Sequence, residues 1–138
     1  MLADDKLGAT REAFVDPLPE SYYAAFCAIE SDPNNEIIIA EHAGSSAGFF
    51  QLTYIPYLTY KGGWRALIES VRVRSEFRDR GIGSELIQYA IERSRSRCCH
   101  VVQLTTDKQR SEALRFYERL GFRATHEGMK LHLEEPTA

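Results

Sequence analysis

Two glycines and two arginines stand directly before a helical segment and form a candidate anion-binding turn. They are Arg78, Arg80, Gly81 and Gly83, within VRVRSEFRDRGIGSELI at 71–87. The first turn of a helix presents unpaired N–H groups and a partial positive charge, and both stabilise an anion. Glycine lets phosphate oxygens approach the backbone, while arginine adds formal charge. The turn therefore predicts a diphosphate site, against the alternative of a tight strand-to-helix turn that holds no ligand.

Two other phosphate motifs do not fit this stretch. A dinucleotide fingerprint needs a third glycine where Leu86 stands, and a Walker loop needs a Gly-Lys-Ser/Thr sequence that the chain lacks. A local site of another kind is therefore expected.

A carboxylate in the strand before this turn is the second candidate for chemistry. In ALIESVRV, strict alternation places Glu69 on the same face as Leu67, Val71 and Val73, so the face is otherwise apolar. The plainer alternatives are an ion pair with a neighbouring arginine, or exposure at a strand edge. Glu41 is a second carboxylate of the same kind.

Hydrophobic periodicity predicts the elements that must position these residues. A short amphipathic helix is expected at 21–30, and Gly121 is placed to end a later one. The expected strands are 36–43, 47–55, 64–74 and 99–106, a final pair at 122–127 and 129–133, and the expected later helices start at Ile82 and span 111–121. This order predicts a mixed sheet covered by helices, of the α/β or α+β class.

Composition limits the classes of protein that fit. The chain of 138 residues is 43% hydrophobic and 27% charged, so a single folded domain over 1–138 is expected. A net charge of -3 argues against a nucleic-acid binder, and no apolar run is long enough to span a membrane. Three cysteines without a framework indicate a reducing cytoplasm, and no metal-ligand spacing occurs, so no metal is expected.

The stretch VRVRSEFRDRGIGSELI resembles the acyl-CoA signature of the GNAT N-acetyltransferase superfamily, an Arg/Gln-x-x-Gly-x-Gly/Ala loop between a strand and a helix. A second family block resembles LTTDKQRSEALRFYERLGF at 104–122, and the likeness covers residues 36–133. It implies a mixed, mostly antiparallel sheet, splayed between the strands at 64–74 and 100–106, with helices on both faces. It also implies acetyl-CoA as cosubstrate, lying in that split.

The resemblance assigns cofactor contacts to this chain. Backbone amides of 79–84 would receive the diphosphate, and the pantetheine arm would run beside 71–73 as a pseudo-strand. A bulge there would turn the Val71 N–H toward the thioester oxygen. The implied cofactor-binding residues are Val71, Arg72, Val73, Arg78, Asp79, Arg80, Gly81, Ile82, Gly83, Ser84 and Arg110.

The resemblance also assigns catalytic roles. Glu69 would accept the proton of the amine, directly or through water, and Tyr117 would return a proton to the departing thiolate. Without the resemblance, Tyr117 would be a core aromatic on a helical stripe. Direct transfer is expected, because neither Cys98 nor Cys99 falls in the expected cleft.

Two departures from the family pattern stand out. Arg110 occupies the position of a frequent asparagine, where it would reach the cofactor phosphates or start a solvated helix. The chain also begins late, either because the given start is internal or because the family's first strand is absent. The acceptor, a small-molecule or peptide amine, is left open, as is a homodimer. A non-catalytic CoA-binding or sensing module and a generic phosphate-ligand binder are the alternatives.

Overall fold

The computed structural model describes residues 1–134, which fall into two compact units, Met1–Leu104 and a second that begins at Thr105. The first unit contains the whole sheet and the helices that precede β4. No helix in the described part of the chain is long and apolar enough to cross a membrane.

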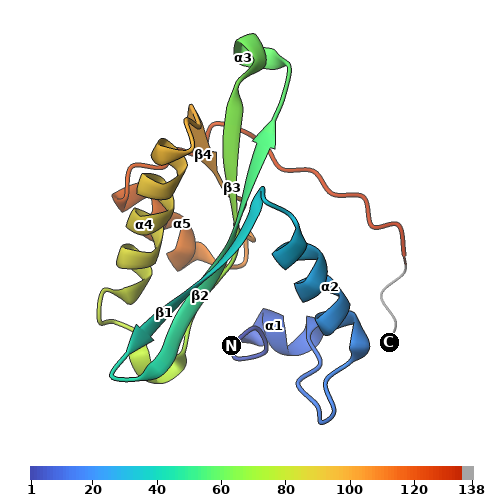
Figure 1. Ribbon diagram of the computed structural model, residues 1–138. Helices are drawn as coiled ribbons and strands as arrows, with labels where there is room; N and C mark the ends of the chain where they lie inside the picture. Colours follow the sequence, from blue (N-terminus) through green and yellow to red (C-terminus); the bar gives the residue numbers. More distant parts are fainter. Residues whose placement is uncertain (135–138) are drawn as a thin grey trace. The chain divides into compact units, whose positions relative to one another are not determined.

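The first unit is built on one four-stranded sheet (Figure 1). Its strands are β1 (Asn35–His42), β2 (Ser45–Pro56), β3 (Trp64–Val73) and β4 (Val101–Gln103), in that order across the sheet. The first three are antiparallel neighbours, whereas β4 runs parallel to β3. The turn from β1 to β2 places Ala43 and Gly44 at φ 50° and 79°, which matches the twist of a two-residue hairpin. The predicted mixed, mostly antiparallel sheet is confirmed.

The core of this unit lies between the sheet and α4 (Ile82–Ser96). The helix presents a buried stripe that repeats at helical spacing, as its sequence predicts. The buried apolar residues of β2, β3 and α4 are Ala47, Phe50, Leu52, Tyr54, Ala66, Ile68, Ile82, Leu86, Ile87 and Ala90. The packing fixes the start of α4 close to the end of β3, which is where the candidate turn lies.

Two further helices precede the sheet. They are α1 (Lys6–Arg11) and α2 (Glu20–Ser31), and α2 packs against β1. Figure 1 shows α2 across the sheet from α4, so helices lie on both faces as expected. None of the side chains of α2 is fully buried.

The link between β2 and β3 contains a turn that the sequence did not predict. It is α3 (Thr59–Gly62), a single helical turn in which Tyr60 and Lys61 have left-handed backbone angles of φ 53° and 60°. Non-glycine residues adopt this conformation only at a cost, so surrounding contacts must hold it. A short 3₁₀ turn, η1 (Ser75–Phe77), follows β3.

The second unit contains α5 (Ser111–Arg119), which ends as the sequence predicts. Gly121 has φ 97°, and its N–H donates to Glu118 while the Phe122 N–H donates to the Tyr117 carbonyl. These two bonds form a Schellman cap, whose usual apolar contact is made here by the rings of Tyr117 and Phe122.

The structure corrects the strand predictions for the C-terminal part of the chain. The strand expected at 99–106 is reduced to β4, three residues long. The strands expected at 122–127 and 129–133 do not form, and Met129, Leu131 and Leu133 are 94%, 86% and 91% exposed. Alternating apolar residues indicate only a tendency to pair, and no ladder in the described residues takes up this segment.

Candidate active site

The sheet opens along one edge of β3. Main-chain pairing joins β3 to β4 only from Arg65 to Leu67, opposite Val101 to Gln103. From Ile68 to Val73, β3 has no strand partner on this side among the described residues. This free edge begins where the sheet splays, as the resemblance implies. An extended ligand can pair with such an edge through main-chain hydrogen bonds.

A β-bulge interrupts β3 beside this edge. Phe49 faces Arg72 and Gln51 faces Glu69, so Phe50 alone faces both Ser70 and Val71. Ser70 has φ 59°, which accommodates the extra residue. The bulge lies at the residue whose N–H is the expected oxyanion donor. Because a bulge re-aims the groups around it, the Val71 N–H need not follow the regular ladder.

The bulge corrects the predicted face of Glu69. Residues that face each other across a ladder share a face, so Glu69 lies with Gln51 and Arg72. Val73 faces Gly48 and therefore lies on the opposite, α4-covered face. Strict alternation assigned Glu69 to the face of Val71 and Val73, which is wrong because one inserted residue reverses the alternation. The face that carries Glu69 therefore holds the polar residues Gln51 and Arg72 together with the apolar Leu67.

Hydrogen bonds show which main-chain groups point to the free edge. The Arg74 N–H donates to the Ala47 carbonyl of β2, so the main chain of the neighbouring Val73 points the other way. Consistent with this, the Val73 carbonyl accepts from Arg78 Nε at 3.2 Å and the Val71 carbonyl accepts from Arg72 at 2.8 Å. Arginine side chains therefore cover the edge that the pantetheine arm is expected to use.

The candidate anion turn has the local geometry that its sequence predicts. Asp79 and Gly81 have φ 60° and 80°, and Gly81 is the N-terminal cap of α4, with no side-chain cap. A Cβ on Gly81 would meet no atom within 4 Å, so its backbone angle, and not crowding, requires glycine here. The N–H groups of Ile82, Gly83 and Ser84 begin the helix and lack carbonyl partners within it. They are free to bind an anion.

The N-terminal segment of the chain contacts this turn. The Asp4 carboxylate accepts from the Ser75 N–H at 3.2 Å and lies 3.8 Å from the Arg78 guanidinium. Arg78 therefore divides its donors between the Val73 carbonyl and Asp4. A bound diphosphate would compete with Asp4 for this cation.

Glu69 is exposed near the middle of β3. Within residues 1–134 its carboxylate forms no salt bridge. Of the two plainer alternatives, pairing with an arginine is therefore excluded for these residues, and exposure to solvent is observed. Gln51, directly opposite, donates to Asn35, as does Thr53 next to it on β2. Glu41 lies instead near the end of β1, two strands away from β3, and is not brought to this site.

The remaining predicted residues belong to the second unit. Tyr117 lies on α5, with its ring 5.1 Å from that of Phe116 and 5.8 Å from that of Phe122. Arg110 is the N-terminal cap of α5. These contacts give Tyr117 a packing role, and its role as an acid stays a prediction, as does the phosphate contact of Arg110.

One ionic cluster that the sequence did not indicate holds α4 in place. Glu36 of β1 accepts from Arg93 of α4 through both carboxylate oxygens and from the buried Tyr54 hydroxyl. The bond from Arg93 holds the pKa of Glu36 below its usual value of 4.5. Burial, with the Glu36 bond, raises the pKa of Tyr54. Arg97 lies over the Tyr54 ring at 4.1 Å. The cluster involves residues 57 positions apart, so no local pattern could reveal it.

Comparisons with known proteins agree with the geometry of the first unit. A model of the acetyltransferase (GNAT) family matches residues 7–122. The chain is 28% identical to the aminoalkylphosphonate N-acetyltransferase of Salmonella typhimurium over 78% of this chain and 69% of that protein. It is 35% identical to the glucosamine 6-phosphate N-acetyltransferase of Trypanosoma brucei brucei over 71% of this chain and 65% of that protein.

A solved structure is closer still. The crystal structure of a transcriptional regulator from Bacillus halodurans superposes with a TM-score of 0.94 at 57% identity. The match covers 96% of this chain and 89% of that chain.

Proposed function

Because the chain belongs to the acetyltransferase (GNAT) family, we propose that it transfers the acetyl group of acetyl-CoA directly to a primary amine. The observation that carries the proposal is the combination of an open β3 edge, a bulge at Ser70 and Val71, and the start of α4 at Ile82, which the chain reaches from β3 through η1. Each feature fits one part of the cosubstrate.

The residues of the first unit fit coenzyme A in three places. The uncapped start of α4 and the cations Arg78 and Arg80 suit a diphosphate. The main chain of Val71 and Val73 has no strand partner on the free edge among the described residues and suits the amides of a pantetheine arm. The arm would displace the Arg72 and Arg78 side chains from the two carbonyls. The bulge leaves the Val71 N–H as a donor for the thioester oxygen, where negative charge develops. Acetyl-CoA would supply the acyl group as a thioester, and these residues would bind and orient it.

Proton transfer is assigned to side chains. An alkylammonium with a pKa of about 10 must lose a proton before it can attack, and the exposed Glu69 carboxylate would accept that proton, directly or through water. The leaving thiolate needs a proton in return, and the Tyr117 hydroxyl is proposed to donate it. Tyr117→Phe is expected to lower kcat while leaving the affinity for CoA unchanged, which steady-state kinetics and calorimetry would measure.

The positions of the cysteines favour direct transfer over an acyl-enzyme. Cys98 and Cys99 follow the C-terminal end of α4, and a 15-residue helix spans about 22 Å from the candidate turn. Burial also raises the pKa of the Cys99 thiol, which reduces its thiolate fraction at neutral pH. Both thiols lie at the end of α4 opposite to the candidate turn, which supports direct transfer to the amine.

The acceptor is proposed to be a small-molecule amine. The two curated relatives are named for an aminoalkylphosphonate and for glucosamine 6-phosphate. The test is a panel of primary amines, incubated with acetyl-CoA and monitored for free thiol. At least one amine is expected to release CoA thiol above the rate of acetyl-CoA hydrolysis.

A second candidate, a CoA-binding module without catalysis, is suggested by the name of the Bacillus halodurans structure. Its description as a transcriptional regulator allows a sensing role, although a net charge of -3 argues against general DNA binding by this chain. Calorimetric binding of CoA without turnover of any amine would favour this candidate. Absence of both binding and turnover would contradict both candidates.

A further inference from the structure

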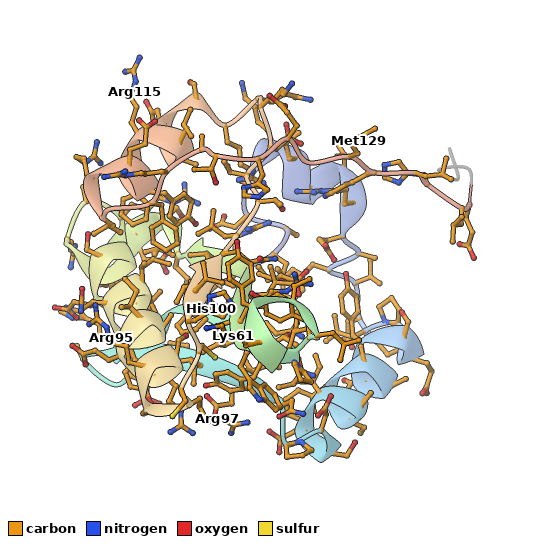
Figure 2. All side chains as sticks on the ribbon, turned by 90° about the horizontal axis from the view of Figure 1, so that it is seen from above. Lys61, Arg95, Arg97, His100, Arg115 and Met129 are labelled. Carbon is orange, nitrogen blue, oxygen red and sulfur yellow. The ribbon has the colours of Figure 1, made fainter. Side chains whose placement is uncertain are left out.

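Four aromatic and cationic side chains gather where β2 ends and β3 and β4 begin. We refer to Tyr57, Tyr60, Arg65 and His100 as the aromatic–cation cluster. The Arg65 guanidinium lies 4.8 Å from the centre of the Tyr57 ring, and the His100 ring lies 5.5 Å from Tyr57 and 4.7 Å from Tyr60. The Tyr57 hydroxyl also hydrogen-bonds His100 Nε2. Figure 2 shows Lys61, next to Tyr60, and His100 at this end of the first unit.

The cluster carries positive charge that no carboxylate neutralises. Within residues 1–134, the ion pairs involve Arg74, Arg78 and Arg93, and none involves Lys61 or Arg65. The Nε atom of Arg65 is buried and has no hydrogen-bond partner. This N–H is a donor that the described residues do not satisfy, so it is left for water or a ligand.

The backbone beside the cluster is held in an unfavourable conformation. Tyr60 and Lys61 both adopt left-handed angles, although neither is glycine or asparagine. The Tyr60 ring contacts His100 and Tyr57, and the Gly62 and Gly63 N–H groups donate to carbonyls at the start of the turn. A Cβ on Gly63 would lie 2.9 Å from the His100 ring. Such strain is typical of segments that position side chains for a ligand.

The ladder places Arg65 of the cluster on the same face of the sheet as Glu69. Arg65 faces Ile55, Leu67 faces Thr53 and Glu69 faces Gln51, all before the bulge, so alternation holds along this part of β3. Arg65 and Glu69 are four positions apart on β3, which corresponds to about 13 Å between their Cα atoms. The two side chains, one cationic and one anionic, can therefore contact opposite ends of one small molecule.

We propose that Arg65, with Lys61 beside it, binds an anionic group of the acceptor, so that the acceptor is a primary amine that also carries a phosphate, phosphonate or carboxylate. This inference rests on the proposed function, because it places the amine at Glu69. The Tyr57 ring holds the guanidinium at the surface of β3, where it can donate to two oxygens of the anionic group.

Matched pairs of amines test the proposal. Glucosamine 6-phosphate is compared with glucosamine, an aminoalkylphosphonate with the alkylamine of equal length, and an amino acid with its amino alcohol. In at least one pair the anionic member is expected to have a kcat/KM at least tenfold higher. The three pairs distinguish phosphate, phosphonate and carboxylate as the anionic group.

The variant Arg65→Met removes the charge and keeps the length of the side chain over Tyr57. It is expected to raise KM for the anionic acceptor at least tenfold, with KM for acetyl-CoA and the rate with the neutral amine unchanged. Arg95→Met, a change of equal charge on the exposed side of α4, is expected to alter none of these values (Figure 2). Lys61→Met, in an exposed turn, provides the same test with a smaller effect if Arg65→Met does not fold.

Equal kcat/KM within every pair, or an Arg65→Met enzyme that still prefers the anionic member, would overturn the proposal. Absence of turnover with every amine would contradict the proposed function instead. In that case calorimetric titration of glucosamine 6-phosphate, the aminoalkylphosphonate and the amino acid still decides the inference. Binding of at least one of them that Arg65→Met abolishes supports it, and binding of none, or equal binding to both proteins, overturns it.

Discussion

Glu69 shows how one inserted residue changes the chemistry assigned to a strand. The family resemblance placed Glu69 next to a bulge as a candidate base, whereas its exposure was only an alternative and its predicted face was wrong. Ser70 causes the difference, since it takes a left-handed angle without being glycine and gives no sign of this in the sequence. The corrected face joins Glu69 to Gln51 and Thr53, and not to the valines that line the free edge.

The role of Glu69 predicts a specific pH dependence for Glu69→Gln. The variant is expected to lower kcat about 100-fold at pH 7, the effect of losing a general base. The defect should shrink as pH rises toward the amine pKa of about 10, because more of the acceptor is already neutral. Rates measured from pH 6 to 10 check this prediction.

Glu41→Gln is the matched control for Glu69→Gln, because Glu41 lies two strands away from β3. It should have normal rates throughout, and both variants should bind CoA normally by calorimetry. A Glu69→Gln enzyme with unchanged kcat, or with a defect that is constant over this pH range, would refute the assignment.

Asp4 predicts that the N-terminal segment opposes cofactor binding. Asp4→Asn removes a carboxylate 3.8 Å from Arg78 and leaves that cation to the diphosphate. The affinity for CoA is expected to rise about two- to fivefold, the range that corresponds to one surface ion pair. Isothermal titration of both proteins with CoA measures the change.

The control for this variant is Glu76→Gln, which removes an equal charge from η1, the short turn that Asp4 contacts through Ser75. Glu76 pairs with Arg74 at 2.9 Å and not with Arg78, so the CoA affinity of Glu76→Gln should stay close to that of the wild type. An equal gain in both variants would indicate a general effect of charge and not competition by Asp4.

At the scale of elements, the position of α4 decides whether its N-terminus can serve as an anion site. Periodicity in the sequence predicted the helix and its buried stripe correctly, since both depend on neighbours three and four residues apart. The pairing of Glu36 with Arg93 depends on tertiary contact and could not be predicted. The short β4, the left-handed turn at Tyr60 and Lys61 and the absent strands beyond Phe122 were missed for the same reason.

Glu36→Gln is expected to loosen this attachment of α4 in a pH-dependent way. The folded-state pKa of Glu36 lies below 4.5, so its stabilisation is complete above that value and is lost as pH falls through the lowered pKa. The variant should therefore lose about 1–3 kcal/mol of unfolding free energy at pH 7. The difference from the wild type should shrink as the pH falls below 4.5 and the Glu36 carboxylate takes up a proton.

Urea unfolding at pH 7, 5 and 3 measures this difference. Glu92→Gln, on the exposed side of the same helix, is the control and should remain within about 0.5 kcal/mol of the wild type. A Glu36→Gln deficit that stays constant down to pH 3 would show that the stabilisation does not come from the ionised carboxylate.

At the scale of the molecule, the order of strands and the split beside β3 were predicted from the resemblance of two stretches, 71–87 and 104–122, to the family's sequence blocks. What the sequence could not predict is how far the strands run on each side of the split, since strand length depends on partners distant in sequence. The open β3 edge, the bulge and the anion turn at the start of α4 all lie in the first unit.

The most direct test of the account is a backbone amide NMR titration of the protein with CoA. If CoA binds along β3 and at the start of α4, the amides of Val71, Val73 and residues 79–84 will shift together and saturate at one dissociation constant. The amide chemical shifts of Ala43 and Gly44, in the β1–β2 turn, should not change. CoA binding that leaves the amides of 79–84 unshifted, or no binding to folded protein, would contradict the account.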